Sequence, residues 1–151
     1  MTHFNTLLLY EIWANDKMID AIRACKPEDE KLNHLMSHIL AARVVWLERI
    51  QGVVLTKAIW ETQSIEKCIK LNTEINEQYT DFIKSLENKE LENLISYKNL
   101  KGDDFSSSLS DILAHVFNHS TYHRGQIANR LKALGLHIPP TDYIVFSRLY
   151  S

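Results

Sequence analysis

Apolar residues recur along most of this chain at steps of three and four, which is the spacing of an amphipathic helix. The pattern is clearest in the stripe Ile65, Cys68, Asn72, Ile75, Tyr79, Phe82 and Leu86. The same periodicity predicts three further helices, over residues 2–24, 27–53 and 109–134. Four amphipathic helices in one chain predict an all-α fold, a four-helix bundle.

Proline, glycine and polar residues mark the ends of these helices. Pro27, followed by acidic residues at 28–30, predicts the start of the second helix, because proline suits the first turn and carboxylates favour the positive end of the helix dipole. Ser108, with Asp111 three residues later, has the spacing of a capping pair and opens the fourth helix. Gly135 ends it.

Two segments depart from the helical pattern. Between residues 91 and 105, the run Lys101-Gly-Asp-Asp supplies turn chemistry, so a short hairpin or a plain loop is expected between the third and fourth helices. Pro139 and Pro140 exclude further helix, and the apolar run 143–146 is expected to dock on the bundle. Residues 1–151 are interpreted as one domain.

Charge and hydropathy argue against two classes of partner. The formal net charge is −2, and lysine and glutamate are mixed along the chain, so there is no basic stripe for nucleic acid. No stretch approaches the roughly 20 apolar residues of a membrane span, and the first residues lack the features of a secretory signal. Cys25 and Cys68 fall on apolar stripes and form no CxxC pair, which indicates free thiols in the cytoplasm.

Five of the seven histidines fall on two predicted helices: His34, His38, His115, His119 and His123. Residues four apart on a helix lie about 6 Å apart on one face, so two imidazoles can reach one metal ion. Residues eight apart are separated by about 12 Å along the axis, which is too far for ligands of one ion. The three histidines of the fourth helix therefore cannot all bind together.

Helical rotation selects among them. At about 100° per residue, His123 lies roughly 20° from the buried Val116 position, His119 roughly 60° and His115 roughly 100°. The inward pair is therefore His119 with His123. On the second helix, His38 borders the apolar arc.

Small residues beside His38, at Ala41 and Ala42, leave room for an ion or a substrate, whereas His34 faces outward. A lone histidine on an apolar face is usually a satisfied core residue. Three inward imidazoles are different from a lone histidine, because each would need its own buried partner. One divalent ion can serve as the partner of all three. Three nitrogen ligands with one open position are typical of catalytic metal sites, and zinc, nickel, iron or copper would be accepted.

Other polar residues lie near buried faces. Glu11 could orient a ligand or form a structural ion pair, and Arg49 could point into the site or pair with Glu11. Gln126 is a candidate partner for a histidine, and Asn72 is interpreted as setting the bundle register. The large aromatic side chain of Trp46 is expected in the core.

The run His115-Val-Phe-Asn-His119-Ser-Thr-Tyr-His123-Arg-Gly-Gln-Ile127 resembles the signature of the DinB (DinB/YfiT-like) family of metalloproteins. Supporting likenesses lie at residues 10–15, 38–50 and 139–143, so the resemblance extends over nearly the whole chain. It implies a four-helix bundle that holds zinc or nickel on His38, His119 and His123, and a homodimer.

The resemblance also implies a range of activities. Some relatives transfer small thiols such as bacillithiol or mycothiol, some are isomerases with a thiol cofactor, and some look like hydrolases. We expect a metal-dependent enzyme that transfers a low-molecular-weight thiol to a small electrophile. The alternatives are a metal-dependent hydrolase, with Glu11 as candidate base, and a non-catalytic metal-binding stress-response protein. No catalytic residue beyond the metal ligands is assigned.

Overall fold

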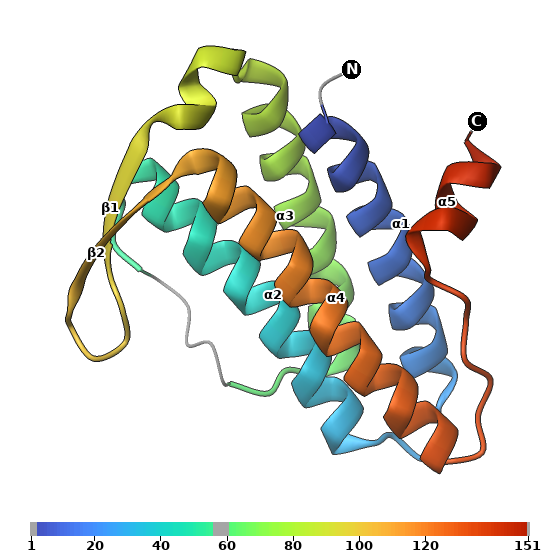
Figure 1. Ribbon diagram of the computed structural model, residues 1–151. Coiled ribbons are helices and arrows are strands. Elements are labelled where there is room, and N and C mark those ends of the chain that lie inside the picture. The colour runs from blue at the N-terminus through green and yellow to red at the C-terminus, as the bar shows by residue number, and fades with distance from the viewer. Residues whose placement is uncertain (1–2, 56–60, 151) are drawn as a thin grey trace.

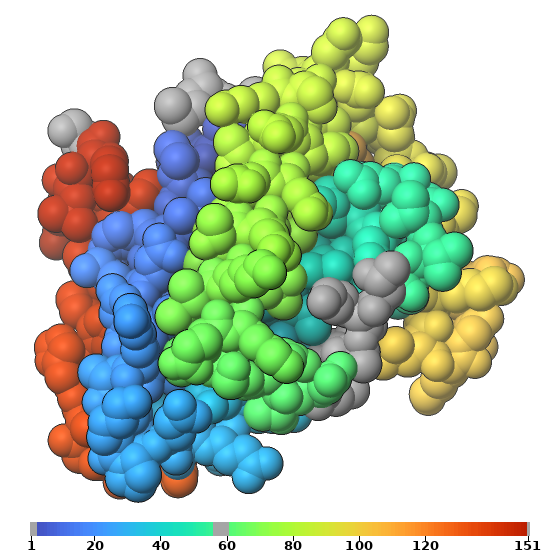
Figure 2. All heavy atoms as spheres, turned by 180° about the vertical axis from the view of Figure 1, so that it is seen from behind, coloured from blue at the N-terminus to red at the C-terminus, as the bar shows by residue number. Residues whose placement is uncertain are grey.

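Four long helices form a bundle in the computed structural model, which describes residues 3–55 and 61–150. They are α1 (His3–Ala24), α2 (Glu30–Gln51), α3 (Ile65–Ser85) and α4 (Leu109–Ala133). Helix α4 packs against α2 and α1, and α3 packs against the same two helices (Figure 1). Seen from behind, α3 covers the face between α1 and α2 (Figure 2). The predicted all-helical bundle is confirmed.

Three short elements connect α3 to α4 (Figure 1). A 3₁₀ turn, η1 (Asn88–Glu92), leads into β1 (Leu94–Lys98) and β2 (Asp104–Ser108). These strands pair antiparallel, with Leu94 opposite Ser108 and Lys98 opposite Asp104, so the hairpin alternative is correct. Gly102 adopts φ 90° in the connecting turn, a conformation that glycine takes without strain.

Side-chain caps fix the helix ends. Ser108 accepts a hydrogen bond from the Asp111 backbone N–H at 3.1 Å, as the capping pattern predicts. The predicted start of α2 at Pro27 is wrong by three residues. Asp29 is the cap instead, because its carboxylate accepts the Leu32 N–H at 3.0 Å, and the helix begins at Glu30.

The apolar stripes meet in one core between the four helices. Cys25 and Cys68 are both buried and free, as expected. The tail docks as predicted but forms a further short helix, α5 (Tyr143–Leu149), whose Phe146 packs against Tyr10. No helix in the described ranges is long and apolar enough to cross a membrane.

Candidate metal centre

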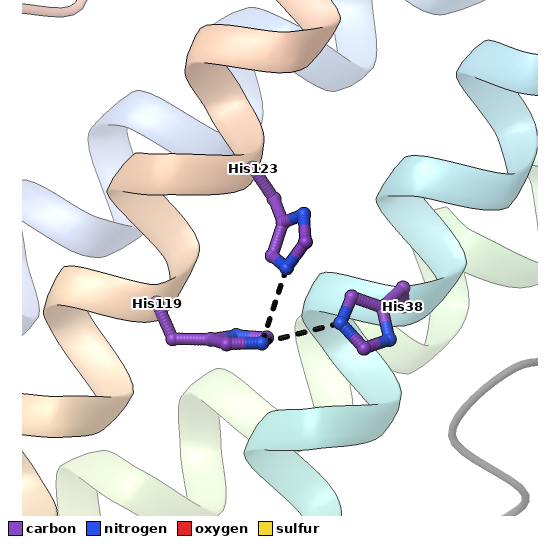
Figure 3. Close-up of side chains that lie close together, drawn as sticks. All are labelled: His38, His119 and His123. Atoms are coloured by element: carbon purple, nitrogen blue, oxygen red, sulfur yellow. Dashed lines mark hydrogen bonds between the residues drawn. The ribbon is translucent and has the colours of Figure 1, made fainter.

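Three imidazoles converge between α2 and α4 (Figure 3). The Nε2 atom of His119 lies 3.2 Å from Nε2 of His38 and 3.2 Å from Nε2 of His123. One ring nitrogen from each residue lies within 4.8 Å of the others. Neighbouring ligands of a tetrahedral ion with metal–nitrogen bonds of 2.0–2.1 Å lie about 3.3–3.4 Å apart. The two short separations therefore fit a divalent ion, and the predicted convergence of the three rings is confirmed.

The two helices hold the rings at different depths. His38 is 4% exposed, whereas His119 and His123 are half-buried and line the outer side of the cluster. Ala41 and Ala42 follow His38 on α2 and are both buried. The exposed part of the cluster is therefore contributed by the two histidines of α4.

Gln126 fixes the protonation pattern of His123. Its amide oxygen Oε1 lies 2.8 Å from Nδ1 of His123, and an amide oxygen can only accept a hydrogen bond. Nδ1 therefore carries the proton, and Nε2 presents its lone pair to the cluster. This contact confirms the predicted role of Gln126 as a histidine partner, the arrangement that orients ligands in metal sites.

Electrostatics keep the central ring neutral. Burial, followed by the neighbouring rings of His123 and His38, lowers the pKa of His119 to about 4. Neutral imidazole is the form that binds a metal. The Nε2 atom of His119 carries either one proton or one lone pair, so it makes at most one linear hydrogen bond to its two neighbours. A central cation would bind all three nitrogens, and the donor set therefore fits a metal.

The remaining histidines of these helices lie outside the cluster. His115 is exposed, and its ring lies 5.6 Å from that of His119 and 5.1 Å from that of Trp46. His34 contacts Thr62, with 2.8 Å between Nδ1 and Oγ1. Both placements agree with the helical rotation that excluded these residues.

Glu11 does not pair with Arg49, and that prediction is wrong. Its side chain is fully buried, where Arg124 donates to it through Nη1 at 2.6 Å and Arg43 lies 3.9 Å away. Burial would raise the pKa of Glu11, but the two guanidinium groups outweigh burial and hold its pKa below the usual value. Asn15 completes the network by accepting from Arg124 at 2.8 Å. Glu11 is therefore an enclosed, ionised structural group.

Sequence reasoning missed Arg124, although a signal for it existed. The rotation that selected His119 also places Arg124 roughly 80° from Val116, on the other side of the buried face. Arg49 neither points into the histidine cluster nor pairs with Glu11, the two positions predicted for it. Its guanidinium lies 4.6 Å from the Trp46 ring, and Trp46 itself is half-buried rather than enclosed in the core. Asn72 donates to Asp16 of α1 at 2.8 Å, a contact between helices that suits a register role.

Comparison with known proteins agrees with this architecture. The model of the DinB family matches residues 1–150, and the chain belongs to that family. Protein DinB of Bacillus subtilis (strain 168) is 27% identical over 152 residues, which cover 89% of this chain and 87% of the relative. The crystal structure of a DinB-like protein from Bacillus cereus ATCC 10987 matches with a TM-score of 0.67 and 19% identity, over 91% of this chain and 94% of that one. The likeness to this crystal structure shows that the two chains share a fold.

Proposed function

We propose that the chain binds one divalent ion, zinc or nickel, through Nε2 of His38, His119 and His123, and acts on small molecules as a metal-dependent enzyme. The supporting observation is the convergence of three ring nitrogens, with separations of 3.2 Å and one lone pair fixed by Gln126. The proposed reaction is transfer of a low-molecular-weight thiol to an electrophile.

An open coordination position supports an enzyme over a purely structural site. Within residues 3–55 and 61–150, the cluster gathers three ligands, and no fourth histidine, cysteine or carboxylate joins it. A bound divalent ion supplies Lewis acidity, which lowers the pKa of a thiol or water at the open position. During transfer, the thiol proton leaves to solvent, sulfur bonds to the electrophilic carbon, and the leaving group departs with its electron pair.

The residues favour an external thiol over a protein nucleophile. Cys25 and Cys68 are both buried, and burial raises the pKa of the Cys68 thiol. Hydrolysis is less well supported, because its candidate base, Glu11, is enclosed in ion pairs with Arg124 and Arg43. The free thiols suit a reducing compartment, and we place the protein in the cytoplasm.

The proposed assembly is a homodimer, as the resemblance to the family implies. Sedimentation velocity at micromolar concentration tests this assembly. A single monomeric species under those conditions would reject it.

Metal analysis tests the site. We expect about one ion per purified chain, with sharp loss in His38→Ala, His119→Ala and His123→Ala, while His115→Ala retains it. The loaded chain is then assayed with N-acetylcysteine and bromobimane, and the rate of thioether formation in excess of the protein-free reaction should disappear in the same three variants. Absence of metal, or equal occupancy in all variants, would reject the site. Occupancy without turnover would favour the non-catalytic alternative.

A further inference from the structure

A run of aromatic rings leads from the histidine cluster to the β-hairpin. The ring of His115 lies 5.6 Å from that of His119 and 5.1 Å from that of Trp46, and Trp46 lies 5.0 Å from Tyr97 of β1. His115 is exposed, while Trp46 and Tyr97 are half-buried. Ring faces of this kind bind apolar or planar parts of a ligand. The run therefore offers a surface that begins at the metal ligands.

Arg49 lies at the far end of this run. Its guanidinium is 4.6 Å from the centre of the Trp46 ring and 5.2 Å from that of Tyr97. Nη2 donates to the backbone oxygen of Lys98 at 2.9 Å, which fixes the group against the hairpin. Its Nε is buried and has no acceptor in the described part of the chain. A buried donor without an acceptor costs about 1–3 kcal/mol, a feature that requires an explanation.

Arg49 also differs from the other arginines that are buried or half-buried. Arg124 and Arg43 both face Glu11, and Arg130 pairs with Asp29. Across residues 3–55 and 61–150, no carboxylate lies within ion-pair distance of Arg49, the remaining half-buried arginine. A planar guanidinium held against two rings is a ready partner for a carboxylate.

A hollow of about 470 Å³ lies beside this guanidinium, between the end of α2 and the hairpin. Its lining includes Arg49, Val53, Tyr97 and Lys98. The ammonium group of Lys98 is already paired with Asp104 at 2.6 Å. Arg49 is therefore the lining cation that lacks a counter-charge in the described residues.

We propose that Arg49 binds the carboxylate of an elongated ligand whose other end reaches the ion on His38, His119 and His123. This inference rests on the proposed function, because it describes the thiol co-substrate of that site. The ligand would cross the exposed ring of His115 and the face of Trp46. It carries a thiol at one end and a carboxylate at the other.

The spacing along α2 sets the length of this ligand. Arg49 follows His38 by eleven residues, or about 16 Å along the helix axis. The guanidinium of Arg49 lies over Trp46, three residues or about 4.5 Å back along the helix, so the gap shortens to roughly 12 Å. An extended chain spans about 3.3–3.6 Å per residue. The expected ligand is thus about as long as a tripeptide.

A series of small thiols tests the inference on nickel-loaded protein. N-acetyl-Cys, N-acetyl-Cys-Gly and N-acetyl-Cys-Gly-Gly are each titrated as the free acid and as the C-terminal amide, with thiolate-to-nickel absorption as the readout. We expect the longest acid to bind about tenfold more tightly than its amide, which corresponds to about 1.4 kcal/mol. The acid and amide of N-acetyl-Cys should bind equally, because neither can reach Arg49.

Variants assign the effect to the guanidinium. Arg49→Gln should abolish the preference for the longest acid while nickel content and amide affinity stay at wild-type levels, which shows an intact site. Arg49→Lys should retain part of the preference, because it keeps the charge but loses the planar fork. Lys101→Gln removes a charge from the exposed hairpin turn and should leave the preference unchanged.

Two results would overturn the role of Arg49 alone, and a third would also overturn the proposed thiol chemistry. Equal affinity of acid and amide in the wild type, or a preference that survives in Arg49→Gln, excludes Arg49 as the anchor while thiol binding to the ion still stands. If nickel binds but no thiol produces the absorption band, the proposed thiol chemistry fails and the inference fails with it.

Discussion

Replacing Glu11 by glutamine removes a carboxylate that contacts two enclosed guanidinium groups. Glu11 is fully buried, and the Arg124 and Arg43 side chains are 2% and 1% exposed. Glutamine keeps the shape and one acceptor oxygen but leaves both arginines without a counter-charge at 2.6 and 3.9 Å. Removal of one partner from a buried ion pair costs about 3–5 kcal/mol. Two guanidinium groups share this carboxylate, so we expect the upper part of that range for Glu11→Gln.

Urea denaturation followed by circular dichroism measures this cost. Domains of this kind are stable by about 5–15 kcal/mol, so the variant should lose a large fraction of the free energy of unfolding. The midpoint of thermal unfolding should fall by roughly 8–20 °C, at about 2–4 °C per kcal/mol. Glu74→Gln is the matched control, because Glu74 pairs with Lys70 on the surface at 4.0 Å and should cost at most about 0.5 kcal/mol. A loss below about 1 kcal/mol in Glu11→Gln would refute this account of the network.

Three further outcomes follow from individual contacts. Gln126→Leu should bind zinc about 10–100-fold more weakly in a chelator competition while its circular dichroism stays unchanged, because His123 loses the acceptor that fixes its Nδ1 proton; equal affinity would contradict this. The folded-state pKa of Glu11 is lowered, so its stabilisation is complete above the unfolded pKa of about 4.3 and is lost as pH falls through the folded pKa. Urea titrations between pH 6 and 3 should show this decline, and Glu11→Gln should show a shallower one. Asp29→Ala should lose about 1–2 kcal/mol of unfolding free energy in the same assay, because it removes both the α2 cap and the ion pair with Arg130, and an unchanged value would reject Asp29 as the cap.

The convergence of His38, His119 and His123 was predictable because it depends on local geometry. The i, i+4 spacing of His119 and His123 puts both rings on one face of any helix, whatever its neighbours are. His38 borders the apolar arc of its own helix, and the structure buries it beside Ala41 and Ala42. The sequence pattern of each helix, taken alone, was thus enough to identify its inward histidines. Packing of α2 against α4 then brought the rings together.

The charged partners could not be predicted in this way. A helical wheel shows that Glu11 faces inward, but which arginine meets it depends on the relative rotation of helices far apart in sequence. Arg124 lies 113 residues from Glu11. Arg49 leans toward Trp46 and the hairpin, and the sequence left that hairpin as one of two alternatives. The start of α2 was missed because proline and aspartate are both good helix starts, and Asp29 gains the capping bond.

The two polar faces of α4 are linked by rotation about its axis. Arg124 and His123 are neighbours in sequence and point about 100° apart, so the helix rotation that joins Arg124 to Glu11 also directs His123 at His38. Side chains extend about 6 Å from the axis, so a rotation of 20° would move a ring nitrogen by about 2 Å, the full length of a metal–nitrogen bond.

This coupling predicts how an apolar replacement of the network should behave. Buried ion pairs can often be replaced by apolar residues without loss of stability, so the triple variant Glu11→Leu, Arg43→Met, Arg124→Met should remain folded with an unfolding free energy close to that of the wild type. Its zinc affinity should nevertheless fall at least tenfold in the chelator competition, because nothing then fixes the rotation of α4. Wild-type affinity in a stable triple variant would show that the apolar core alone sets the rotation and that the buried charges have no part in building the site.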